Sequence, residues 1–127
     1  MQQFLDTSIL IRFENSFARL KELGDVQIPV IAVGEFSRGI YETQNQQLRN
    51  RAERFLSRQI FSFPIVDFDF SASRAWASLL KALKDSGLTM KFGDSLIAAQ
   101  CIAANASIIT SDSDFDRVPG LKVIKFD

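Results

Sequence analysis

Short apolar runs alternate along this chain with longer stretches of helical periodicity, and this alternation limits the folds open to it. The apolar runs have the length of buried strands, and most are followed by apolar residues that recur every three to four positions. We expect strands at residues 2–5, 26–28, 63–66, 106–110 and 121–126. Strands that alternate with helices predict a parallel sheet with helices packed on both faces. The expected fold class is therefore α/β.

Helix-forming stretches fill the intervals between these strands. Capping residues, glycine stops and apolar spacing predict helices at residues 8–23, 30–42, about 70–85 and 94–104, with a polar, basic stretch at 45–60. The first helix is expected to break near Asn15 and Ser16. Gly34 and Gly39 fall inside the second, where each costs about 1 kcal/mol relative to alanine, so we expect something to pack closely there. Pro64 places its strand at an edge of the sheet.

The composition excludes several kinds of site. The chain has 127 residues, one cysteine and no histidine, so it can form neither a Cys/His zinc site nor a His-based triad. Any metal must be held mainly by oxygen, which favours Mg²⁺ or Mn²⁺ as cofactor. The length fits one domain over residues 1–127, and the balance of 15 basic and 15 acidic residues gives no general argument for a nucleic-acid partner. The single cysteine, with no signal region and no apolar run of membrane-spanning length, predicts a cytoplasmic protein.

Acidic residues stand where the expected topology brings distant segments together. Asp6 ends the first strand, Asp112 follows the fourth, Asp94 opens a helix, and Glu35 lies in the first half of another. The carboxyl ends of parallel strands and the starts of the following helices lie at one edge of a sheet, where ligands bind. We therefore expect these carboxylates to meet. Their mutual repulsion would be removed by a shared divalent cation.

Each acid also has an ordinary structural explanation. Asp6 could cap the following helix, Asp94 could be a first-turn acid favoured by the helix dipole, and Glu35 could be a boundary residue. Asp112 and Asp114 could be turn residues. The combination of all five favours a metal site, and in-line attack on a phosphodiester is the chemistry that such a site performs.

Four segments together resemble the pattern of PIN-domain ribonucleases. They are Leu5-Asp6-Thr7-Ser8, Gly34-Glu35-Phe36 with Gly39, Asp94-Ser95-Leu96-Ile97-Ala98-Ala99, and Thr110-Ser111-Asp112-Ser113-Asp114-Phe115. The ending from Arg117 to Val123 looks like the finish of the VapC-type toxins of bacterial toxin–antitoxin pairs. The resemblance covers essentially the whole chain. One departure is Gln100-Cys101, where related toxins often carry histidine, and this position is not one of the acids.

The resemblance implies a three-layer PIN-like domain with a central, mostly parallel sheet of four to five short strands. It also implies a metal-dependent endoribonuclease toxin that cleaves tRNA or another structured RNA, is inhibited by a cognate VapB-type antitoxin, and forms a homodimer. Asp6, Glu35, Asp94 and Asp112 match the acidic quartet of the family, which carries both catalysis and metal binding. Asp114 is a further candidate metal ligand, because the family varies most at its fourth acid.

Other side chains near the acids are candidates for binding the substrate. Thr7 and Ser8 can hydrogen-bond a neighbouring carboxylate or a water molecule, and Lys91 and Arg117 flank the acidic motifs, where they can meet phosphates. Two alternatives remain open. Phosphoryl transfer to Asp6, as in haloacid-dehalogenase-like phosphatases, expects a second Asp where this chain has Ser8. The other alternative is a non-catalytic module that merely keeps the fold.

Overall fold

The computed structural model describes residues 2–126, and the side chains of all of these except residues 13–16 and 59. Its strands form one parallel sheet in the order β3–β2–β1–β4–β5. They are β1 (Gln3–Leu5), β2 (Val26–Pro29), β3 (Ile65–Val66), β4 (Ser107–Thr110) and β5 (Val123–Lys125). The first strand of the chain thus lies at the centre of the sheet, and the expected α/β class with parallel strands is confirmed.

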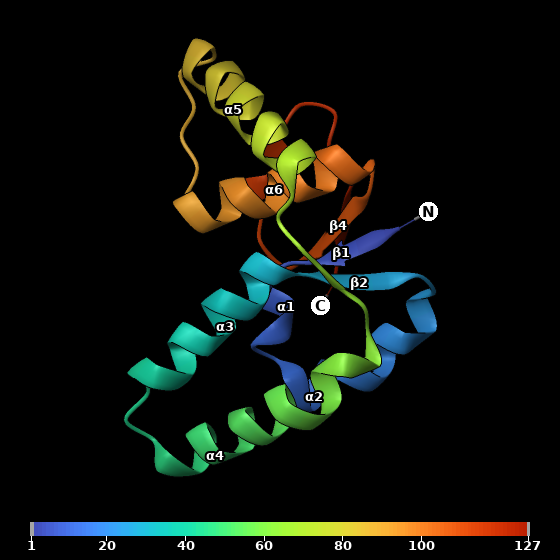
Figure 1. Cartoon of the computed structure of the whole chain (residues 1–127), viewed down its shortest axis with the longest axis vertical. Coiled ribbons are helices and arrows are strands. Elements are labelled where there is room, and N and C mark those ends of the chain that lie inside the picture. The colour runs from blue at the N-terminus through green and yellow to red at the C-terminus, as the bar shows by residue number, and fades with distance from the viewer. Residues whose placement is uncertain (1, 127) are drawn as a thin grey trace.

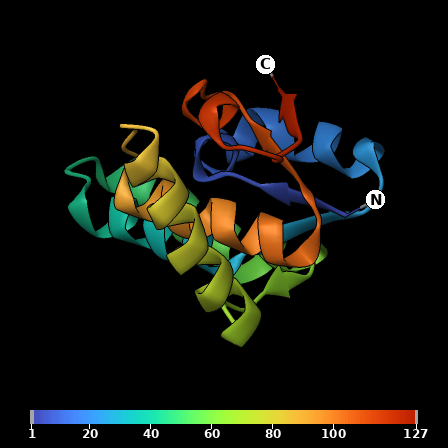
Figure 2. The ribbon, with the colours of Figure 1, turned by 90° about the horizontal axis from the view of Figure 1, so that it is seen from above.

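Helices cover both faces of this sheet. They are α1 (Thr7–Leu10), α2 (Phe13–Leu20), α3 (Val30–Glu42), α4 (Gln46–Arg54), α5 (Phe70–Asp85) and α6 (Phe92–Ala104), with short helical turns η1 (Lys21–Leu23), η2 (Phe55–Gln59), η3 (Ile60–Ser62) and η4 (Asp114–Arg117). Figure 1 shows α3 and α4 towards one end of the molecule and α5 and α6 towards the other. In Figure 2 the strands lie between α6 on one side and the blue α1–α2 segment on the other. This is the expected three-layer arrangement. Within the described residues, no helix is both long and apolar enough to cross a membrane.

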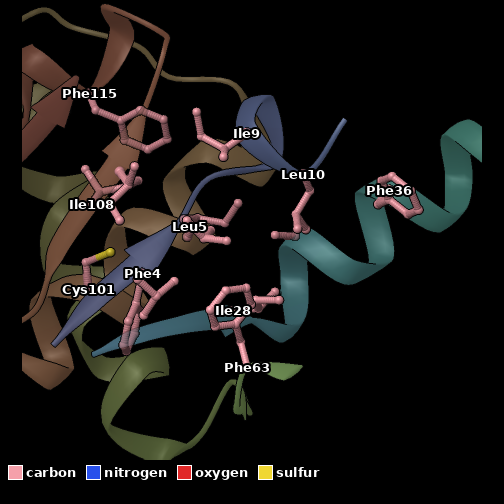
Figure 3. Packing of buried hydrophobic residues seen from close by; sticks show 14 of the residues in the cluster. Phe4, Leu5, Ile9, Leu10, Ile28, Phe36, Phe63, Cys101, Ile108 and Phe115 are labelled. Carbon is pink, nitrogen blue, oxygen red and sulfur yellow. The ribbon is translucent and has the colours of Figure 1, made fainter. Parts of the chain in front are cut away.

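The residues at the centre of the sheet are apolar because helices pack on both of its faces, while β4 begins and ends with the polar residues Ser107 and Thr110. Phe4, Leu5, Ile28 and Ile108 are each at most 1% exposed. Figure 3 shows these side chains from three neighbouring strands at the centre of the core, with Cys101 of α6 close by. Burial raises the pKa of the Cys101 thiol, so the residue packs as a small apolar group.

Several expectations about local structure are confirmed. Helix α3 has the predicted bounds of residues 30–42, and β3, which follows Pro64, lies at an edge of the sheet. Asp69 caps α5, because its Oδ1 accepts a hydrogen bond from the backbone N of Ala72 at 2.9 Å. Gly24, with a φ of 97° that favours glycine, ends η1, as the glycine stop predicted after residue 23 requires.

Two expectations are wrong. The helix predicted over residues 8–23 breaks at Ile11 and Arg12 and continues through residues 15–16. The break coincides with a contact between distant parts of the chain, in which Arg12 Nη2 donates to the carbonyl of Phe126 at 2.8 Å. In addition, Gly34 and Gly39 do not serve close packing, because a Cβ added at either would meet nothing within 4 Å.

Candidate active site

Asp6 follows the central strand β1 and is only 2% exposed. Its Oδ2 accepts hydrogen bonds from the hydroxyls of Ser8 and Thr110, both at 2.8 Å. Its Oδ1 is also buried but has no hydrogen-bond partner among the described residues. Asp6 occupies the N-cap position of α1, yet its side chain makes no capping bond. Helix capping therefore does not explain this buried acid.

Thr110, at the end of β4, links Asp6 to Asp112. Its fully buried Oγ1 donates to Asp6 and accepts a hydrogen bond from the backbone N of Asp112 at 2.9 Å. Asp112 Oδ1 in turn accepts from the backbone N of Asp114 at 3.0 Å, just where η4 begins. Because β1 pairs directly with β4, this network fixes Asp6 and Asp112 relative to each other. Thr110 is not among the site residues that the sequence predicts. Its position at the end of a buried strand, just before two acids, is the sequence feature that indicates a role in the site.

Glu35 reaches the same edge of the sheet from α3. Its Oε1 accepts a hydrogen bond from Thr7 Oγ1 at 2.5 Å. The buried side chains of Ala32 and Phe36 on the same helix fix the orientation of α3 against the core. On its other side the carboxylate lies against Gly93, where an added Cβ would come within 2.7 Å of Glu35 Cδ. Glu35 therefore bridges the space between α1 and α6.

Asp94 lies in the first turn of α6, among the other acids. Burial, followed by the charges of Asp6, Glu35 and Asp112, raises the pKa of Asp94 from 3.8 to about 6, against a smaller lowering effect of Lys91. An isolated acid in a first helical turn would have the opposite shift, because the helix dipole favours its charged form. The raised pKa of Asp94 therefore reflects first its burial and then the crowding of other carboxylates around it.

Asp114 joins this cluster from η4. One carboxylate oxygen from each of Asp94, Asp112 and Asp114 lies within 4.8 Å of the other two. Arg117 Nη2 lies 3.7 Å from Asp114 Oδ1, so part of the negative charge at Asp114 is balanced. The structure thus brings Asp94, Asp112 and Asp114 together at one sheet edge. Asp6 is linked to Asp112 through Thr110, and Glu35 lies against Gly93 beside Asp94, but neither belongs to this group of three.

The predicted substrate-binding residues surround this cluster in two ways. The hydroxyl of Thr7 donates a hydrogen bond to Glu35, and that of Ser8 donates one to Asp6. Of the two partners expected for these hydroxyls, a carboxylate or a water molecule, both thus have a carboxylate. Lys91 and Arg117 are both exposed and lie beside the acids, as their effects on Asp94 and Asp114 indicate. Contact of these four side chains with a substrate stays a prediction.

Residues 4–121 of the chain match the family model described as "PIN domain". The chain belongs to the PIN domain family. The matched range includes every acid of the site, from Asp6 to Asp114, and the strands and helices that carry them. The expected resemblance is thereby confirmed.

Individual relatives of this PIN domain agree with the family match. Ribonuclease VapC4 of Mycobacterium tuberculosis is 30% identical over 98 residues, which cover 76% of this chain and 74% of the relative. Ribonuclease VapC2 of Rickettsia felis is 27% identical over an alignment that covers 100% of this chain and 99% of the relative. Within the PIN domain family, the chain is thus of the VapC type.

Solved structures show the same fold. VapBC2 from Rickettsia felis, bound to a DNA fragment from its promoter, superposes with a TM-score of 0.84 at 26% identity and covers 100% of both chains. DNA-bound VapBC from Salmonella typhimurium has a TM-score of 0.87 at 19% identity, covers 98% of both chains, and supports the fold alone. The three-layer PIN-like architecture expected from the sequence is confirmed.

Proposed function

We propose that this PIN domain protein is a metal-dependent endoribonuclease toxin that cleaves phosphodiester bonds in tRNA or another structured RNA. The observation that carries the proposal is the convergence of carboxylates from the end of β1, α3, α6 and the β4–η4 turn on one sheet edge, where burial, followed by their repulsion, raises the pKa of Asp94 to about 6. Relatives named ribonuclease over most of the chain support the same reaction class. A cytoplasmic location fits the single, buried Cys101, which needs no oxidising compartment.

The donor set fits Mg²⁺ or Mn²⁺. Asp6 Oδ1 is a buried carboxylate oxygen without a hydrogen-bond partner among the described residues, and hard divalent cations prefer such oxygens. Asp6, Glu35, Asp94 and Asp112 would hold the ion, with Asp114 beside them. Asp112 is the stronger candidate for the fourth acid, because its charge acts on Asp94 while Asp114 lies beside a cation, Arg117. When bound, the ion supplies Lewis-acid chemistry, which neutralises charge on the scissile phosphate and makes a nearby water molecule more acidic.

The protein side chains contribute the positioning of the acids and of the substrate. The hydroxyls of Thr7 and Ser8 hold Glu35 and Asp6 in place through hydrogen bonds of 2.5 and 2.8 Å. In the metal-free protein the pKa of Asp94 is raised to about 6, so this carboxyl can take up a proton that a bound cation would displace. We propose that the exposed Lys91 and Arg117 bind phosphates on either side of the bond that is cleaved.

We further propose that a VapB-type antitoxin binds an apolar groove between α1, α3 and α4. The groove encloses about 160 Å³ and is lined by Ile11, Phe36, Gly39, Ile40, Thr43, Leu48 and Ala52. Ile11 is 62% exposed and Leu48 is 37% exposed, so an apolar segment of a partner could bury both. Phe36 in the groove and Glu35 in the site are neighbours in α3, so the groove and the acids share this helix. A solved relative, VapBC-5 from Mycobacterium tuberculosis, is described as a member of the VapBC family of toxin–antitoxin systems, which supports such a partner.

Cleavage of RNA by the purified protein tests the proposed reaction. The protein, stripped of any antitoxin, is incubated with total tRNA and with Mg²⁺ or Mn²⁺, beside Asp6→Asn and Asp94→Asn. We expect cleavage by the wild type that is lost in both variants and on addition of EDTA. Phosphatase activity without RNA cleavage would instead support phosphoryl transfer at Asp6, and neither activity would support a non-catalytic module.

Binding of the partner is tested separately. Leu48→Asp is expected to abolish binding of the antitoxin encoded beside this protein and to leave RNA cleavage intact, because Leu48 touches the groove and not the acids. Retained binding by Leu48→Asp would refute this location of the interface. The proposed homodimer is checked by sedimentation of the free protein, for which a monomeric mass at micromolar concentration is the contrary result.

A further inference from the structure

Gly93 precedes Asp94 in the first turn of α6, and its hydrogen atoms face the carboxylate of Glu35. A Cβ at this position would clash with Oε2 of Glu35. It would also lie 2.7 Å from Cδ and 3.2 Å from Oε1 of the same side chain. All three atoms belong to the carboxyl group of one side chain, and that group is part of the acidic cluster. Within the described part of the chain, the other glycines have no residue beyond their own local backbone within 4 Å of an added Cβ.

Neither helix can retreat to make room for a larger residue at position 93. On the far side of the turn, Ser95 is 2% exposed, donates to the carbonyl of Phe92 at 2.6 Å and accepts a hydrogen bond from Trp76 Nε1 at 3.0 Å. These bonds tie the start of α6 to α5. Helix α3 is likewise fixed, because Phe36, the residue after Glu35, is buried in the core. The backbones of α3 and α6 are therefore held at their present separation.

The carboxylate of Glu35 is the group that must move. It is the far end of a flexible side chain, so it can rotate away at little loss of packing. Its present position is set from the other side by Thr7, whose hydroxyl donates to Oε1 at 2.5 Å. A methyl group at position 93 would displace the carboxylate from this place between Thr7 and α6, while the fold would stay intact.

We propose that Gly93 is a positioning residue for the nuclease site: the lack of a side chain there lets the Glu35 carboxylate lie against the first turn of α6 and share a divalent cation with Asp94. This role rests on the proposed metal-dependent function. It also accounts for a glycine inside the first turn of a helix, where alanine would otherwise be favoured.

Gly93→Ala in the full-length, antitoxin-free protein tests the role, with Gly34→Ala as the matched control. Gly34 precedes Glu35 in α3, and a Cβ there meets nothing within 4 Å, so the control makes the same chemical change beside the same acid without the clash. The affinity for Mn²⁺ is measured by calorimetry, RNA cleavage by gel, and stability by urea unfolding in EDTA. We expect Gly93→Ala to lose about 10- to 100-fold in Mn²⁺ affinity and in cleavage, as for other residues that orient metal ligands. We expect its unfolding midpoint to be unchanged or higher, and Gly34→Ala to bind Mn²⁺ as the wild type does.

A second pair of variants separates displacement of Glu35 from general damage to α6. In a Glu35→Ala background there is no carboxylate to displace, so Gly93→Ala should cause no further loss of Mn²⁺ affinity. A further loss of the same size in that background would overturn the role, as would wild-type affinity in Gly93→Ala alone or an equal loss in Gly34→Ala. Absence of Mn²⁺ binding and cleavage in the wild type would instead overturn the proposed function, and the role with it.

Discussion

Replacing Thr110 with valine removes the hydroxyl that joins Asp6 to Asp112 and keeps the shape of the side chain. Thr110 is fully buried, and its Oγ1 makes one hydrogen bond of 2.8 Å to Asp6 Oδ2 and one of 2.9 Å from the backbone N of Asp112. Loss of a hydrogen bond to an ionised carboxylate costs about 1.5–3 kcal/mol, and an unsatisfied buried backbone N–H adds about 1–3 kcal/mol. Asp6 retains the hydrogen bond from Ser8, and Asp112 is only half-buried, so both contributions fall near their lower limits.

The expected loss of unfolding free energy for Thr110→Val is therefore about 2–4 kcal/mol, or a fall in Tm of roughly 10 °C for a domain of this size. Urea unfolding in EDTA measures it without any contribution from metal. Thr110→Ser is the matched control, because it keeps the hydroxyl and loses one methyl group, worth about 1 kcal/mol. If Thr110→Val proved as stable as the wild type, or more stable than Thr110→Ser, the hydrogen-bond network would not hold the two acids as described.

Three further predictions concern the metal, the pH and the core. Millimolar Mg²⁺ or Mn²⁺ should raise the Tm, and at a hundredfold excess over Kd the added stability is about 2.7 kcal/mol. This increase should vanish in Asp94→Asn. An unchanged melting curve of the wild type would argue against metal binding by the free protein. In EDTA, the urea midpoint should fall as the pH rises from about 4 to 6, because the pKa of Asp94 is 3.8 when unfolded and about 6 when folded, so that the folded state binds more protons in this window. Asp94→Asn should flatten that slope, and an equal slope in both proteins would exclude Asp94 as its source. Phe115→Ala, at a residue with 0% exposure, should cost about 3–5 kcal/mol in urea unfolding, whereas Phe70→Ala, at 80% exposure, should stay within about 0.5 kcal/mol; equal effects would contradict the described core.

The sequence predicts those features of the structure that depend on residues close together in the chain or on the general geometry of a parallel sheet. Helix α3 could be bounded at residues 30 and 42 because Pro29 precedes it and a polar stretch follows its apolar face. The convergence of Asp6 and Asp112 could be predicted from parallel pairing alone, since both follow strands that end at the same edge.

The features that the sequence does not predict depend on contacts between distant segments. The break between α1 and α2 coincides with the hydrogen bond from Arg12 to Phe126, which joins opposite ends of the chain. The need for glycine arises at residue 93 and not at residues 34 and 39, because it depends on how closely α6 approaches the side chain of Glu35. No helical or strand periodicity encodes that distance, which only the packing of two helices sets.

The central place of β1 has a consequence for how the protein is made. Residues 3–5 of β1 pair with residues 107–109 of β4. Strand β1 can therefore form this pairing only after β4, about a hundred residues later in the chain, has been synthesised. Before β4 is synthesised, Asp6 lacks the hydrogen bond from the Thr110 hydroxyl, and Asp112 is not beside it. We therefore expect a chain truncated before residue 107, which lacks β4 and Asp112, to degrade no RNA in a translation extract.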